Sequence, residues 1–285
     1  MPENGKFRST VTTRSRQTFE QIVTLPDLAI PLAEAALLLA CEEYPHLSLR
    51  PYLEFLDRIA VRVREIAGRQ PGREGTIDGL NRVLYGEYGF SGNTTDYYDA
   101  RNSFLNEVIE RRKGIPITLS ALYISVAHRL DFPMEGVGLP GHFIVRHRSE
   151  GEDIFLDPFN NGARLTRETL GELARSALGP RADVEPRLAR STNRQILARM
   201  LNNLRMIYLK ARLFDKALSM MDLMLITDPE AIDLYRQRGL LGLQMRRFDR
   251  AARDLRHYVR HHGNEDEPDF RDSVKALARI QAMLN

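Results

Sequence analysis

The sequence is poor in cysteine, with Cys41 the only one among 285 residues. An intrachain disulfide is therefore excluded, and this usage is typical of a protein from a reducing compartment. Cys41 lies in an apolar run with helical character, where a cysteine is far more often an inert core residue than a nucleophile. We therefore expect no structural disulfide and no catalytic thiol.

Long hydrophobic stretches are also missing. The longest apolar run near the N-terminus covers residues 35–41 and is far too short to span a bilayer. The first eighteen residues are polar and lack the apolar core of a secretory signal. We expect a flexible tail over residues 1–18, no membrane association and a cytoplasmic location. An organellar transit peptide is the alternative interpretation of the tail.

Charge of neither sign dominates the chain. The 41 Lys and Arg residues are interspersed with 38 Asp and Glu residues, for a net charge of +3. A dedicated nucleic-acid binder concentrates its basic residues on one face, so a nucleic-acid partner is not favoured. The Arg-rich stretch 246–260 is interpreted as a solvated helix face, with an acidic partner as the functional alternative.

Cofactor and metal motifs are equally scarce. Residues 136–141, GVGLPG, fit the dinucleotide fingerprint only as a string, because a helical segment precedes them and an extended one follows. His142 and His147 are five residues apart, which on a regular strand places them on opposite faces. We expect neither a cofactor nor a metal.

Helical periodicity dominates residues 19–112, and the nearly continuous apolar segment Ile117–Leu130 predicts a buried central helix. Gly114 is suited to close the helix before it, and Pro116 is suited to begin the central helix. Residues 143–145 and 154–156 are β-branched or aromatic runs that predict two strands joined by a loop at 149–152. A further helix is predicted over 165–177.

A repeat follows a stretch rich in Pro and Arg, which predicts a linker over 181–193. FDKA at 214–217 recurs as FDRA at 248–251, an offset of 34 residues that matches the tetratricopeptide spacing. We predict a first domain over 19–180 and a tetratricopeptide-like helical module over 194–285, closed by a capping helix at 274–284. Since two repeats are few for independent stability, we expect the module to pack on the rest of the protein.

His142 and Asp157 are the sharpest candidates for chemistry. His142 begins the first predicted strand after Pro140 and Gly141, and Asp157 ends the second. If these strands pair as a hairpin, the two side chains lie at the same end, where the carboxylate is placed to accept a hydrogen bond from the imidazole. A structural His–Asp hydrogen bond is the alternative, because spacing alone does not establish the geometry of a catalytic pair.

Three strings, GIPITLS at 114–120, PGHF at 140–143 and DPFN at 157–160, are supported by LY at 84–85, GFSG at 89–92, DYYD at 96–99 and RNS at 101–103. Together these strings resemble the bacterial SirB family. These proteins resemble transglutaminase-like domains joined to C-terminal tetratricopeptide repeats. The resemblance implies an α+β fold that is mainly helical, with a papain/transglutaminase-like core and a small antiparallel sheet, followed by an α-helical tetratricopeptide-like module.

The same resemblance assigns roles to individual positions. Transglutaminase-like domains place a cysteine nucleophile at the start of the central helix, and a base His and an orienting Asp on neighbouring strands. Carried onto this chain, the base is His142, the orienting residue is Asp157, and the nucleophile position holds Pro116. Proline has no thiol, and it also lacks the backbone N–H that helps to bind the oxyanion. Losing one such donor costs about 10²–10³ in rate.

Two further features weaken the catalytic interpretation. Transglutaminases often add an indole donor, and this sequence contains no tryptophan. Ser120 is the nearest hydroxyl on the same helix face as Pro116, but four residues of helix displace it by roughly 6 Å along the axis. That displacement is large compared with the length of a nucleophile–base hydrogen bond.

We therefore predict a non-catalytic transglutaminase-like protein that binds a protein or peptide partner in a regulatory or scaffold role. The partner would use the tetratricopeptide module and a groove that includes Pro116, Pro140, Gly141, Phe159 and Asn160. The alternative is a hydrolase or acyltransferase acting on amide or ester bonds. It would use the His142–Asp157 pair with Ser120 as an atypical nucleophile, or with an activated water or substrate group.

Overall fold

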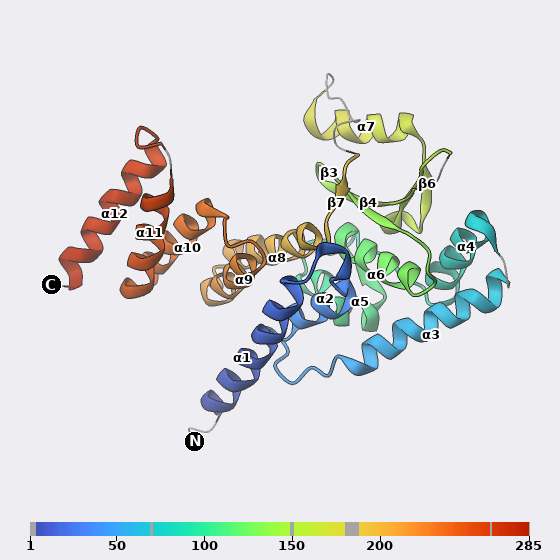
Figure 1. The fold of residues 1–285 in the computed structure, drawn as a ribbon, viewed down its shortest axis with the longest axis horizontal. Helices are drawn as coiled ribbons and strands as arrows, with labels where there is room; N and C mark the ends of the chain where they lie inside the picture. Colours follow the sequence, from blue (N-terminus) through green and yellow to red (C-terminus); the bar gives the residue numbers. More distant parts are fainter. Residues whose placement is uncertain (1–3, 69–70, 149–150, 180–187, 263, 285) are drawn as a thin grey trace. The chain divides into compact units, whose positions relative to one another are not determined.

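The computed structural model describes residues 4–68, 71–148, 151–179, 188–262 and 264–284, and it divides into two compact units, Met1–Met200 and Leu201–Asn285 (Figure 1). The first unit is a helical assembly around a small sheet. The elements that precede its central helix are α1 (Asn4–Val23), η1 (Asp27–Ala29), α2 (Leu32–Ala40), α3 (Arg50–Ala67), α4 (Gly72–Asn81), the π-helical turn η2 (Arg82–Glu87), β1 (Ser91–Gly92), η3 (Ala100–Ser103), α5 (Leu105–Arg111) and β2 (Lys113–Gly114).

The N-terminal segment differs from its expectation. Residues 4–18, expected to form a flexible tail, belong to helix α1, while residues 1–3 lie outside the described part of the chain. The C-terminal turns of α1 bury Phe19, Ile22 and Val23, and Arg16 forms an ion pair with Glu42 at 2.6 Å. Since residues 6–23 contain neither Gly nor Pro, the helix continues toward the N-terminus from this anchored end.

The central helix α6 (Pro116–His128) confirms the predicted buried helix. Every residue from Pro116 to Ala127 is buried, and Pro116 occupies the first turn, where its missing N–H leaves no hydrogen bond unmade. The two-residue strands β1 and β2 pair in parallel just before this helix and bring the loop around Ser91 to its start. The helix is therefore enclosed by protein from its first residue.

The sheet has five antiparallel strands in the order β6-β5-β4-β3-β7. Helix α7 (Arg167–Leu178) covers one face and α6 packs on the other (Figure 1). The side chain of Thr166 caps α7 by accepting the N–H of Thr169 at 3.2 Å. The strands are β3 (Glu135–Leu139), β4 (His142–His147), β5 (Ile154–Asp157), β6 (Ala163–Leu165) and β7 (Arg190–Ser191).

Two of these strands, β4 and β5, are the predicted hairpin, whose loop residues 149–150 lie outside the described residues. The strand β3 was not anticipated because Gly136 and Gly138 hide its pattern. Both glycines leave room for neighbouring side chains. An added Cβ at Gly136 would lie 2.8 Å from the Phe143 ring, and one at Gly138 would lie 2.5 Å from the guanidinium of Arg199.

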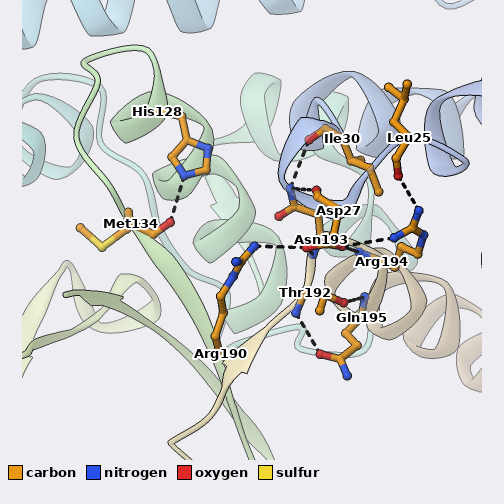
Figure 2. Close-up of polar contacts among 10 residues, drawn as sticks. All are labelled: Leu25, Asp27, Ile30, His128, Met134, Arg190, Thr192, Asn193, Arg194 and Gln195. Atoms are coloured by element: carbon orange, nitrogen blue, oxygen red, sulfur yellow. Dashed lines mark hydrogen bonds and ion pairs between the residues drawn. The ribbon is translucent and has the colours of Figure 1, made fainter.

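The start of α8 (Asn193–Lys210) is hydrogen-bonded to the connection between α1 and α2 (Figure 2). The carboxylate of Asp27 accepts the backbone N–H groups of Asn193 and Arg194 at 3.0 and 3.1 Å, and the Arg190 guanidinium at 3.1 Å. An acidic group at a helix N-terminus stabilises it, even when it comes from a distant part of the chain. The predicted linker 181–193 therefore ends in strand β7 and a helix start, and its residues 181–187 lie outside the described residues.

The second unit is helical throughout its described residues and contains α9 (Phe214–Thr227), α10 (Ile232–Gln244), α11 (Phe248–His261) and α12 (Pro268–Leu284). The repeated FDKA and FDRA strings begin α9 and α11. Gly239 and Gly242 let α10 approach Leu255 and Ala251 of α11 closely. The helix predicted at 274–284 begins earlier, at Pro268, and buries Ile280 against α11. The boundary between the units falls within α8, later than the predicted residue 194.

Candidate recognition site at His142 and Asp157

The His142–Asp157 pair is formed at one end of the β4–β5 hairpin. His142 is the first residue of β4 and Asp157 is the last residue of β5. Nε2 of His142 lies 2.8 Å from Oδ2 of Asp157, and the two side chains are 15% and 3% exposed. The predicted placement of both side chains at one end of the hairpin is thereby confirmed.

The Asp157 carboxylate is held by several donors. Its oxygens accept the backbone N–H groups of Phe159 and Asn160 at 3.0 and 3.3 Å, and the side-chain amide of Asn160 at 2.7 Å. Burial by itself raises the pKa of Asp157, but the hydrogen bond and charge of His142, together with the Asn160 hydrogen bonds, hold this pKa below its usual value. Asp157 is therefore ionised at neutral pH.

An ionised Asp157 determines the state of the imidazole. The carboxylate only accepts hydrogen bonds, so Nε2 of His142 carries the proton that it donates, and Nδ1 carries the lone pair in the neutral ring. Nδ1 makes no hydrogen bond to any residue that the structure describes. The ring is thus oriented by one nitrogen and has the other available as an acceptor.

The turn before His142 explains its position. Pro140 and Gly141 connect β3 to β4, and Gly141 has a φ of +70°, as the third residue of a type II turn requires. Leu139 pairs with His142 across this two-residue connection. Pro140 is half-buried and Gly141 is exposed, so both lie at the surface beside His142.

Pro116 and Ser120 lie inside the protein rather than at this surface. Pro116 is buried at the first position of α6. Ser120 has no exposed surface, and its hydroxyl donates to the carbonyl oxygen of Phe143 at 3.4 Å. That bond joins α6 to the residue that follows His142, and the structure gives no hydrogen bond between Ser120 and His142 themselves.

Phe159 and Asn160 belong to the same surface as His142. The Phe159 ring lies edge-on to the His142 ring, with 6.2 Å between centroids, and Asn160 is exposed while it contacts Asp157. An added Cβ at Gly92 would lie 2.6 Å from the Phe159 ring, so β1 leaves room for that ring only because residue 92 is glycine.

Tyr97 and Tyr98 also lie here, and their place was not predicted. The Tyr97 ring is 6.1 Å from the Phe159 ring and 5.4 Å from the Tyr98 ring. The two tyrosines are 39% and 70% exposed. The DYYD string marked the resemblance, but nothing in its spacing places it beside His142.

Asn102 holds the tyrosine-bearing loop. It is fully buried, accepts the side-chain amide of Asn93 at 3.0 Å, and donates to the carbonyl oxygens of Asp96 and Tyr97 at 2.7 and 3.2 Å. The carbonyl of Asn102 in turn accepts the Thr118 hydroxyl of α6 at 2.8 Å. The loop is therefore fastened to the N-terminal turn of the central helix by buried polar groups.

Arg199 of α8 is a second residue that the sequence did not reveal. Its Nη2 donates to the carbonyl oxygens of His142 and Leu139 at 3.0 and 3.4 Å, and its guanidinium lies 5.0 Å from the centre of the Phe143 ring. Burial lowers the pKa of Arg199. Since residue 199 is far from 139–143 in the chain, only the packed structure brings it to this site.

Two features are absent from the described residues. No group of three or more His, Cys, Asp or Glu side chains is arranged to hold a metal ion. Across the same residues, no helix combines the length and the apolar character needed to cross a membrane.

Comparison with known proteins identifies the family. A family model described as "Transglutaminase-like superfamily" matches residues 50–202, more than half of the chain. The chain belongs to this superfamily. The matched range includes Pro116, His142, Asp157 and Arg199, and a tetratricopeptide repeat model matches residues 204–284. The mainly helical fold with a small antiparallel sheet, followed by tetratricopeptide helices, is therefore confirmed.

Whole-length relatives confirm the resemblance to the SirB family. A UPF0162 protein of Xylella fastidiosa is 38% identical over 249 residues, which cover 85% of this chain and 87% of that protein. Protein SirB1 of Salmonella typhimurium is 26% identical over 81% of this chain and 86% of its own length. The mouse F-box only protein 21 is 42% identical over 98 residues, only 16% of its length. No solved structure matches.

Proposed function

We propose that this protein is a non-catalytic member of the transglutaminase-like superfamily that binds a protein or peptide partner in a regulatory or scaffold role. The observation that carries the proposal is Pro116 at the first position of α6. That position has neither a nucleophile nor a backbone donor for an oxyanion. Cys41 offers no substitute, because it is buried and burial raises the pKa of its thiol.

The surface beside His142 supports binding. Tyr97, Tyr98, Phe159 and the His142 ring form a continuous set of ring contacts, which we call the aromatic face. Tyrosine gives a binding surface a large apolar area together with a polar tip, and it is enriched among residues that dominate binding energy. Because Asn102 holds this loop in place, little conformational entropy is lost when a partner docks.

We reduce the predicted groove to fewer contact residues. Pro140, Gly141 and Asn160 border the aromatic face, whereas Pro116 is buried at the first position of α6 and is not a contact residue. The tetratricopeptide repeats suggest protein partners as well. We therefore place the first recognition surface on the aromatic face and a second on the repeats.

Selection of random peptides displayed on phage tests the proposal on the full-length protein. Peptides selected by the wild type should bind at least tenfold more weakly to Tyr97→Ala and Tyr98→Ala, since each removes an exposed anchor. Leu178→Ala, at an exposed apolar position at the end of α7, is the matched control and should bind normally. An absence of selected peptides, or binding that neither tyrosine variant changes, contradicts the proposal.

A hydrolase or acyltransferase is the second candidate, and Nδ1 of His142 favours it. This nitrogen has no partner among the described residues, while Asp157 orients the ring, as in a base that activates water. Hydrolysis of activated ester and amide substrates distinguishes the candidates. We expect no turnover above background; turnover that disappears in His142→Ala establishes the hydrolase instead. If turnover is also lost in Ser120→Ala, the Ser120 hydroxyl is the nucleophile.

A further inference from the structure

Arg199 stands out because its charge is not compensated. Its side chain is half-buried, and no acidic side chain among the described residues forms an ion pair with it. Arg146, in the same unit, shows the usual arrangement: it is buried and pairs with Glu135 at 2.7 Å and Asp153 at 3.4 Å. A partly desolvated guanidinium without a counter-charge is an unfavourable arrangement, which a bound anion relieves.

The donors of Arg199 are only partly used. A guanidinium carries five N–H donors in a planar fork. Nη2 uses its two on the carbonyl oxygens of His142 and Leu139, whereas Nε and Nη1 make no hydrogen bond to any residue that the structure describes. The two carbonyl contacts hold the guanidinium in place, so that a ligand need not order it.

Arg199 is continuous with the aromatic face. It bonds the backbone of His142, and its charge acts on the Tyr97 hydroxyl, opposing the rise in the pKa of Tyr97 that burial causes. Asp157, the acid of the site, is already engaged by His142 and Asn160. The surface therefore combines exposed rings with one uncompensated positive charge.

We propose that the partner segment carries an Asp or Glu side chain that pairs with Arg199 while a neighbouring residue packs on the aromatic face. This inference rests on the proposed binding function and names the chemistry of its partner. Guanidinium and carboxylate match in a two-pronged geometry that few other pairs offer.

The structure favours a side-chain carboxylate over a chain terminus. Proteins capture a terminal carboxylate with clusters of backbone N–H groups. The turn beside Arg199 contains Pro140, which has no N–H, and its flanking residues Leu139 and His142 direct carbonyl oxygens at the guanidinium. An acidic side chain on a flexible stem reaches the arginine without needing such a cluster.

The test compares matched peptides on the full-length protein. Random peptides displayed on phage are selected by the wild type and by Arg199→Gln, which removes the charge but keeps an amide donor for the His142 carbonyl. The wild type should enrich peptides with Asp or Glu over those with Asn or Gln, and Arg199→Gln should not. For one selected peptide, changing its acid to the amide should weaken binding to the wild type about tenfold. The same change should leave binding to Arg199→Gln unaltered.

Two further variants keep the test decisive. Arg199→Lys retains the charge and should retain part of the acidic preference, which secures the conclusion if Arg199→Gln unfolds. Arg175→Gln, at an exposed arginine on α7, should leave the preference unchanged. Circular dichroism melting curves check the fold of each variant.

The outcomes separate this inference from the function on which it rests. Peptides that depend on Tyr97 and Tyr98 but show no acidic preference overturn the inference and leave the binding function standing. The same holds if Arg199→Gln, still folded, keeps the full preference. If the wild type selects no peptides, both are overturned.

Discussion

The two sides of the candidate site differ in how they are built. On the strand side, Asp157 and His142 form a polar cluster held by hydrogen bonds of 2.7–3.3 Å, whose partners lie in the hairpin or directly after it. On the helix side, Pro116 and Ser120 are enclosed in an apolar helix. The His–Asp geometry is therefore set by the hairpin and its turns. It does not require a reactive group on the helix.

Among these variants, Asp157→Ala should destabilise the strand side of the site most. We expect it to lower the free energy of unfolding by about 3 kcal/mol, because several donors lose a buried, charged acceptor at once. Urea denaturation measures the change. Asp157→Asn is the control and should cost less, since it preserves the shape and one acceptor oxygen. Equal losses in both variants would contradict a role for the charge.

Pro116→Cys tests the helix side by supplying both missing groups, a thiol and a backbone N–H. If the hairpin holds His142 in a working geometry, Pro116→Cys should hydrolyse an activated ester measurably above background, where the wild type does not, because it has a thiol nucleophile as well as an oxyanion donor. Pro116→Ala, which restores the N–H alone, is the matched control. Equal rates in the two variants would show that the position no longer faces the imidazole.

The pH dependence of stability reports on the strand side alone. The pKa of Asp157 is lowered in the folded protein, so its contribution is fully present above the ordinary carboxyl pKa of about 4 and is lost as the pH falls through the folded value. The stability difference between the wild type and Asp157→Asn should therefore narrow below about pH 4. Urea titrations at several pH values measure it, and a difference that stays constant would contradict the lowered pKa.

Ser120→Ala should have the smallest effect. It removes one long hydrogen bond to the Phe143 carbonyl, so we expect a loss of about 1 kcal/mol or less in unfolding free energy. Denaturation in urea measures this loss, with Ser125→Ala as a control, because Ser125 makes a hydroxyl–carbonyl bond within the same helix. If Ser120→Ala lowered the unfolding free energy as much as Asp157→Ala, the helix side would contribute as much to the stability of the site as the strand side.

The parts that could be predicted are those with a local cause. Apolar composition and Pro116 mark α6, the β-branched runs mark β4 and β5, and Thr166 marks the start of α7. The strand β3 was missed because its glycines interrupt the strand pattern. Their small size leaves room for residues elsewhere in the chain, the Phe143 ring and the Arg199 side chain. The short strands β6 and β7 have too few residues to show a period at all.

Four features could be recognised without coordinates: the family, the helix start without a nucleophile, the hairpin with His142 and Asp157 at one end, and the period of the repeats. Each follows from residue types at short spacing, where backbone preferences act. The positions of Tyr97 and Arg199 beside the His142 site, and the burial of Ser120, become clear only in the folded chain. Those contacts join residues far apart in the chain, and their positions are set by packing and by buried hydrogen bonds, which leave no periodic trace in the sequence.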